Sequence, residues 1–168
     1  DLAQKLSDRV VCVRGDRIDK CGTPDEIFTD AYIAQLYQVS CGSYHTVYGF
    51  MELEKPAGKP EVFVIGGGGS GIPIYRQLQR KGIPFAAGVL HENDMDLPAA
   101  QALAAQIITE RAFEPIGEQA IAQAKACMET CTRVICCPER FGTMNAGNQQ
   151  LMQLAQKQGK LFNHKRGL

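Results

Sequence analysis

The feature that most constrains this chain is the stretch VFVIGGGGSG at residues 62–71. Its first four residues are apolar and mostly β-branched, which indicates a buried strand of a parallel sheet. The glycines that follow allow positive φ angles and a close approach of the backbone to a ligand. Residues 72–78 then resume apolar side chains at helical spacing, and Pro73 is tolerated in a first helical turn. The stretch therefore predicts a strand, a glycine turn and a helix in direct succession.

This glycine turn is the first candidate site. A helix that starts directly after a strand directs unpaired N–H groups and the positive end of its dipole at one point, which suits a phosphate or a carboxylate. Gly66, Gly68 and Gly71 match the pattern GxGxxG, although a purely structural tight turn has the same signature. We predict a phosphate-binding site in this turn, formed by Gly66, Gly67, Gly68, Gly69, Ser70 and Gly71.

After the glycine turn, apolar runs of strand length alternate with helical patterns. Strands are expected at 85–90, 106–110, 132–137 and 160–162, and helices at 98–103, 115–130 and 145–158. This alternation predicts the α/β class, with a Rossmann-like, doubly wound and mostly parallel sheet of about five strands. Such sheets bind ligands beyond the carboxyl ends of their strands, so the loops at 66–71, 91–96 and 138–148 should lie together.

Two of these loops carry polar candidates. His91, Glu92, Asp94 and Asp96 follow the second strand, about twenty residues after the glycine turn, where a dinucleotide-binding fold places an acidic contact to ribose. The two aspartates could equally cap the next helix. In the loop after the fourth strand, Arg140 and Asn145 could meet an anionic or amide-bearing ligand, or simply be solvated.

The residues before the glycine turn have a different organisation. Two short strand-like runs around residues 14–16 indicate a β-hairpin, and Thr23, Pro24 and Glu26 form a capping box that starts a helix. A further helix is expected from Asp30 to Tyr37, a single edge strand over residues 43–53 and a linker at 56–60. We therefore divide the chain into segments 1–40, 41–60 and 61–168.

Composition narrows the function classes. Eighteen basic and eighteen acidic residues balance, so nothing favours nucleic acid or an anionic membrane surface. No apolar run approaches the ~20 residues that a membrane-spanning helix needs, so direct membrane insertion is not expected. The seven cysteines are an odd number and suit reduced thiols in the cytosol. Cys127 and Cys131 share a helix face, but no Cys/His zinc pattern is present and we predict no metal site.

Residues 1–40 resemble a known family. The segments SDRVV (7–11), GDRI (15–18) and CGTPDEIF (21–28) look like the closing part of an ABC-transporter ATPase, and LYQV at 36–39 is similar to its iron-siderophore and cobalamin importer branch. The resemblance implies a C-terminal part of a longer protein, because this chain has no GxxxxGK[ST] phosphate-binding motif. It also implies a cytoplasmic location at the inner face of the cell membrane, a membrane permease as partner, and a homodimer.

The second part of the chain carries two further resemblances. VIGGGGSG (64–71), AGVL (87–90), DMD (94–96) and FGTMN (141–145) are similar to an accessory C-terminal domain of some bacterial ABC importer ATPases. More loosely, the glycine turn and PERFGT (138–143) resemble nucleotide-binding proteins related to the cytokinin-activating phosphoribohydrolases. This implies that Phe141, Gly142 and Thr143 belong to the ligand site. The family's catalytic glutamate position holds Ala146, so its hydrolysis is not implied.

Three functional interpretations follow. The first is a regulatory domain of an importer ATPase that senses a small ligand, with a nucleotide, a dinucleotide or cobalamin as the possible ligands; His91 or His45 could then meet the cobalt of cobalamin. The second is an enzyme acting on a nucleotide-like substrate, although no catalytic residues are discernible. The third is a dimerisation module that binds no ligand.

Overall fold

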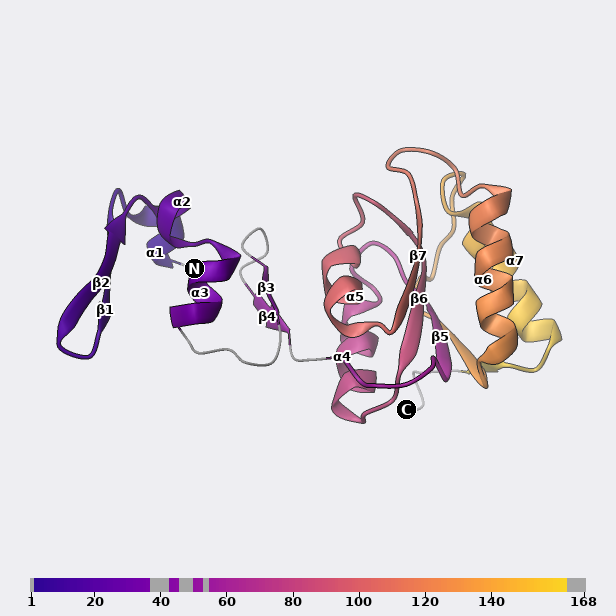
Figure 1. The fold of residues 1–168 in the computed structure, drawn as a ribbon. Helices are drawn as coiled ribbons and strands as arrows, with labels where there is room; N and C mark the ends of the chain where they lie inside the picture. Colours follow the sequence, from indigo (N-terminus) through magenta and orange to yellow (C-terminus); the bar gives the residue numbers. More distant parts are fainter. Residues whose placement is uncertain (1, 37–42, 46–49, 53–54, 163–168) are drawn as a thin grey trace. The chain divides into compact units, whose positions relative to one another are not determined.

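The computed structural model describes residues 2–36, 43–45, 50–52 and 55–162 of the 168-residue chain. The chain forms two compact units, Asp1–Glu54 and Lys55–Leu168 (Figure 1). Each unit is described by itself. Among the described helices, none combines the length and the apolar composition that crossing a bilayer requires.

The N-terminal unit is built around a β-hairpin. Its elements are α1 (Leu2–Leu6), β1 (Val10–Arg14), β2 (Arg17–Gly22), α2 (Pro24–Ile27) and α3 (Asp30–Leu36). The antiparallel pairing of β1 with β2 confirms the predicted hairpin. At the start of α2 the Glu26 carboxylate accepts a bond of 2.8 Å from the Thr23 N–H, the reciprocal half of a capping box. The predicted continuation of α3 to Tyr37 lies outside the described residues.

One prediction for this unit was wrong. Residues 43–53 do not form a single edge strand, because β3 (Ser43–His45) and β4 (Phe50–Glu52) pair with each other as antiparallel strands. The alternation of side chains is the same in one long strand and in two short ones. Pairing the two halves satisfies their backbone groups locally, which a lone strand could not do without a neighbouring sheet.

The C-terminal unit contains a five-stranded parallel sheet in the order β7-β6-β5-β8-β9, which confirms the predicted fold class. Its strands are β5 (Val62–Ile65), β6 (Phe85–His91), β7 (Gln106–Glu110), β8 (Arg133–Cys136) and β9 (Leu161–Phe162). The chain runs outward from β5 to β7 on one side and then returns to place β8 and β9 on the other side. The strand order therefore reverses between β5 and β8.

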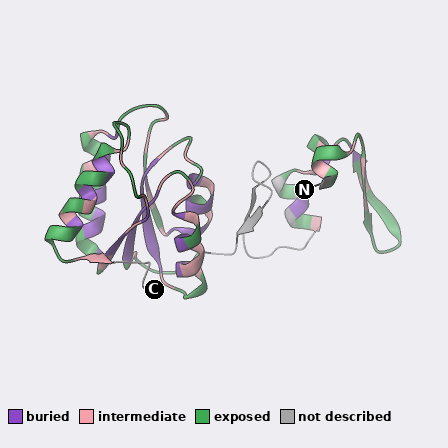
Figure 2. Ribbon diagram, turned by 180° about the vertical axis from the view of Figure 1, so that it is seen from behind, coloured by how far each residue is buried: buried purple, intermediate pink, exposed green. Residues whose placement is uncertain are grey.

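Helices cover both faces of this sheet, as Figures 1 and 2 show. Helices α4 (Ile72–Arg80) and α5 (Leu97–Leu103) cover one face, and α6 (Glu118–Thr130) and α7 (Ala146–Lys157) cover the other. The central strand supplies both cores because its side chains alternate: Val62 and Val64 pack under α4 and α5, whereas Phe63 and Ile65 pack under α6 and α7. Cys136 and Cys137 likewise belong to opposite cores.

Candidate functional site

The point where the strand order reverses carries a crevice of about 270 Å³. It lies where a doubly wound sheet is expected to bind its ligand, beyond the carboxyl ends of its strands. The residues that line it come from the glycine turn, from β6 and the loop after it, and from the start of α7: Gly66, Gly67, Gly68, Val89, His91, Asp94, Met144, Asn145 and Asn148. The volume suits a small group or one end of a larger ligand.

The fold itself explains why these positions of the turn are glycines. Gly67, Gly68 and Gly69 have φ angles of 138°, 63° and 87°, which side-chain-bearing residues rarely adopt. Gly66 and Gly71 have ordinary φ angles, but a Cβ at either position would collide with the buried side chains of Tyr75 and Asp96. The GxGxxG pattern is therefore explained by backbone conformation and packing before any ligand is considered.

Asp96 occupies the position that the sequence assigned to an anionic ligand. This carboxylate is fully buried and accepts bonds from the N–H groups of Gly67 (2.6 Å), Gly71 (2.9 Å) and Ile72 (3.3 Å). Burial raises the pKa of Asp96, and the bonds from Gly71 and Gly67 oppose that rise. Asp96 stands at the N-cap position of α5, as one of the two alternatives for the aspartates had it, but its side chain makes no capping bond to that helix. It binds instead the N–H groups at the start of α4, which precedes it in the chain.

Asp94 completes this arrangement from a more open position. Its carboxylate accepts bonds from the Gly68 N–H, at 3.0 and 3.2 Å, and from the Asp96 N–H, at 2.8 Å. Unlike Asp96, it is partly exposed and lines the crevice. The two carboxylates together bind four N–H groups of the segment from Gly67 to Ile72, and Asp94 is the one that a ligand can reach.

Tyr75 packs behind the turn. Its ring stacks on Phe85, with 5.2 Å between ring centroids, and its side chain is fully buried. Its hydroxyl lies next to Gly66 and Gly71, and it has no hydrogen-bond partner among the described residues. Burial raises the pKa of Tyr75, and the nearby Asp96 charge adds to the rise. This phenol fills the space that the missing Cβ atoms of the two glycines leave.

His91 and Asn145, two of the candidate site residues named from the sequence, both line the crevice. The Nε2 atom of His91 lies 2.9 Å from the Glu114 carbonyl oxygen, so Nε2 donates and, in the neutral ring, Nδ1 is left as an acceptor. The side-chain oxygen of Asn145 accepts a bond of 2.7 Å from the Gly142 N–H and so fixes the loop before α7.

Asn148 is a crevice residue that sequence reasoning missed. Its buried side-chain amide accepts from the Val89 N–H at 3.0 Å and donates to the Val89 carbonyl at 2.9 Å. These bonds satisfy the β6 backbone where its pairing with β7 is irregular, between Ala87 and Leu90. No motif marks Asn148, because its partner is 59 residues away in the sequence.

The other predicted site residues are not among those that line the crevice. Ser70 donates its hydroxyl hydrogen to the Gly67 carbonyl at 2.7 Å, which stabilises the turn from within. The remaining ones are Gly69, Gly71, Arg140, Phe141, Gly142 and Thr143. Arg140, Gly142 and Thr143 are exposed and Phe141 is half-buried. Among the described residues, no three His, Cys, Asp or Glu side chains gather as metal ligands would.

Comparison with known proteins places this chain beside ATP-binding proteins of ABC transporters. An uncharacterized ABC transporter ATP-binding protein of Methanocaldococcus jannaschii, MJ0873, is 26% identical over 91 residues, which cover 54% of this chain and 31% of the relative. The cobalamin import ATP-binding protein BtuD of Halobacterium salinarum is 26% identical over 146 residues, covering 82% of this chain and 36% of the relative. The chain thus spans about a third of the length of these relatives.

A family model gives a second, more local match. The model of the MJ0874 family matches residues 85–166, which begin at β6 and include α6 and α7. No solved structure matches this chain. The resemblance of this chain to ABC-transporter ATPases is therefore supported by its relatives. The looser resemblance to phosphoribohydrolases stays a prediction.

Proposed function

We propose that this chain is the C-terminal part of the ATP-binding protein of an ABC importer that carries cobalamin or an iron chelate. Two relatives with the names given above support this assignment. The N-terminal unit supports it independently, because its hairpin exposes Val11, Val13 and Ile18 by 52%, 62% and 66%. Neighbouring exposed apolar side chains are typical of a surface that another part of a protein covers.

In this proposal the parent protein works in the cytoplasm, at the inner face of the cell membrane. Its partners are a second copy of the ATPase and the membrane permease. The motifs that bind ATP belong to the parent protein and not to the two units described above. The C-terminal unit is then an accessory domain, and the binding of its ligand regulates the importer.

The accessory domain, we propose, senses a small phosphate-bearing ligand in the crevice lined by the glycine turn, β6 and the start of α7. The observation that carries this proposal is the contact of the partly exposed Asp94 carboxylate with the Gly68 N–H at 3.0 Å. A phosphate that enters the crevice can exchange with this carboxylate on the same N–H, while the buried Asp96 holds the rest of the turn. Released from Gly68, the loop that carries His91 and Asp94 can change its position and couple ligand binding to ATP hydrolysis.

The direct test measures binding of AMP, NAD and hydroxocobalamin to the 168-residue chain by titration calorimetry, with adenosine as the phosphate-free control. AMP should bind more tightly than adenosine. Asp94→Asn should strengthen AMP binding by about tenfold, because it removes a like charge from the phosphate position. The matched control is Glu92→Gln, since Glu92 carries the same charge in the same loop and does not line the crevice.

Two results would contradict the exchange of phosphate for Asp94. One is the absence of binding by every one of these ligands. The other is weaker binding after Asp94→Asn, which would mean that Asp94 itself binds the ligand, as it would bind a ribose hydroxyl. In the full-length importer ATPase, the ligand should also change the rate of ATP hydrolysis, and deleting residues 55–168 should abolish that response.

A further inference from the structure

We propose that β7 pairs with β7 of a second copy of this chain, so that two sheets join into one. This inference goes beyond the proposed sensing function and does not depend on it. Strand β7 bonds to β6 on one side, and no strand in the described part of the chain pairs with its other side. An unpaired edge presents a row of backbone N–H and C=O groups that another strand can bind.

The two edges of the sheet differ in how they are protected. Within the described residues, edge strand β9 has two residues, Leu161 and Phe162, and such short strands are one means by which proteins block their edges. Edge strand β7 has five residues, QIITE, and contains no lysine, arginine or proline. Its Gln106 and Thr109 are exposed. Of the usual protections against pairing, β7 carries the terminal charge of Glu110, and its register with β6 shifts between Ala87 and Leu90.

The sequence of β7 is complementary to itself. A two-fold symmetric interface needs the same surface on both copies. Antiparallel pairing centred on Ile108 places Gln106 opposite the partner's Glu110 and Ile107 opposite the partner's Thr109. The first pair joins an amide to a carboxylate, and the second joins two β-branched residues, both of which are favourable cross-strand pairs. The Gly117 N–H, which donates to Glu110 at 2.8 Å, lowers the pKa of Glu110 and keeps it an acceptor.

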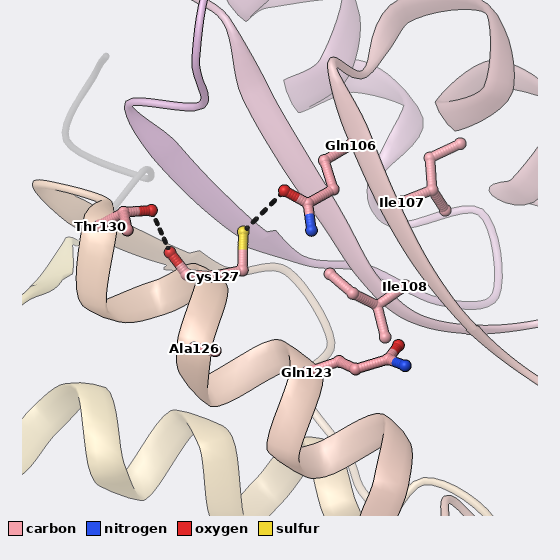
Figure 3. A pocket seen from close by; sticks show the side chains of 7 residues that line it. All are labelled: Gln106, Ile107, Ile108, Gln123, Ala126, Cys127 and Thr130. Atoms are coloured by element: carbon pink, nitrogen blue, oxygen red, sulfur yellow. Dashed lines mark hydrogen bonds between the residues drawn. The ribbon is translucent and has the colours of Figure 1, made fainter.

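The surface beside β7 is also suited to a second copy. A groove of about 380 Å³ lies between β7 and α6. In Figure 3, Gln106 and Ile108 of β7 face Gln123 and Cys127 of α6 across this groove. Cys127 donates its thiol hydrogen to the Gln106 side-chain oxygen at 3.7 Å, which holds Gln106 along the groove.

The α6 positions on this groove are uncharged. Gln123, Ala126 and Thr130 line it at helical spacing, whereas the exposed charges Lys125 and Glu129 fall on another side of α6 by the same spacing. A second copy can therefore approach β7 without burying a charge from α6. The uncharged groove therefore favours a second copy of this chain over a charged peptide as the partner.

The test uses sedimentation equilibrium of the 168-residue chain and its variants. The wild-type mass should rise with concentration toward twice the 18.4 kDa of one chain. Gln106→Lys places an ammonium group opposite the partner's Glu110, whereas Gln106→Glu places a like charge there. The dimer of the glutamate variant should dissociate roughly ten times more readily than that of the lysine variant, since two symmetric pairs change at once.

The same substitutions of Gln153, an exposed residue on α7, are the matched controls and should leave dimerisation unchanged. Thr109→Lys should give a monomer, because residue 109 faces the partner's apolar Ile107 and the substitution would place a charge there. Hydrogen exchange of residues 106–110 in the wild-type chain should slow as its concentration rises, which tests the edge without any substitution. A monomeric wild-type chain, equal dissociation constants for the two Gln106 variants, or exchange independent of concentration would overturn the proposal.

Discussion

The two units of this protein differ in how they bury their apolar side chains. In the C-terminal unit, cores on both faces of the sheet enclose the side chains of β5 completely, and Tyr75, Phe85 and Leu151 are also fully buried. In the N-terminal unit, the buried hydrophobic residues among those described are Ile27 and Ile33, while the hairpin exposes Val13 and Ile18. One unit therefore has a closed core and the other an open apolar surface.

This difference shows how each unit obtains its stability. Burial of apolar surface is the main favourable term in folding, and it must offset the conformational entropy of every ordered residue. The C-terminal unit meets this condition with its own side chains. The described residues of the N-terminal unit do not, because they bury few apolar side chains and gain little from burial. A larger ATPase domain that covers β1 and β2 would provide the missing contacts.

The largest effect should come from separating the units. Residues 55–168 alone should unfold cooperatively with a melting temperature close to that of the whole chain, because both cores lie within this segment. Residues 1–54 alone should show no cooperative transition. Circular dichroism melting curves of the two segments measure both outcomes. A cooperative transition of residues 1–54 would mean that the hairpin unit needs no covering surface.

The next largest effect concerns the closed core. Gly66→Ala should lower the free energy of unfolding by about 3 kcal/mol, because its Cβ would collide with the Tyr75 hydroxyl. Gly142→Ala is the control: nothing lies within 4 Å of a Cβ at that position. Urea unfolding measures each change.

The substitution Tyr75→Phe tests why Gly66→Ala should lower the free energy of unfolding. It should cost little by itself, because this hydroxyl has no hydrogen-bond partner among the described residues, and it should restore much of the stability lost in Gly66→Ala. If the double variant is no more stable than Gly66→Ala, the collision with Tyr75 does not explain why position 66 is a glycine.

The smallest effect should come from the open surface. Val13→Ser should change the free energy of unfolding of this chain by no more than about 0.5 kcal/mol, since Val13 is 62% exposed. In the longer protein that we propose as the parent of this chain, the same substitution should cost more, because the hairpin would there be covered. Thermal unfolding of both proteins compares the two situations. Equal effects in the two proteins would argue against a covering domain.

The order of the elements could be read from the sequence alone. Runs such as VFVI at 62–65 and QIITE at 106–110 are short, apolar or β-branched, and bounded by turn residues or helical patterns, so local chemistry is enough to identify a strand. The position of the crevice also followed, since parallel strands meet at their carboxyl ends. The hairpin of β3 and β4 did not, because its alternation is compatible with one strand or two.

Only the tertiary structure decided what the glycine turn binds within the chain. The sequence showed a turn suited to an anion, but the carboxylate that accepts its N–H groups belongs to Asp96, which is 25 residues from Gly71. The pairing of Asn148 with Val89, 59 residues apart, was equally invisible. A local pattern can indicate which groups need a partner, whereas the identity of that partner depends on which distant residues the sheet brings together.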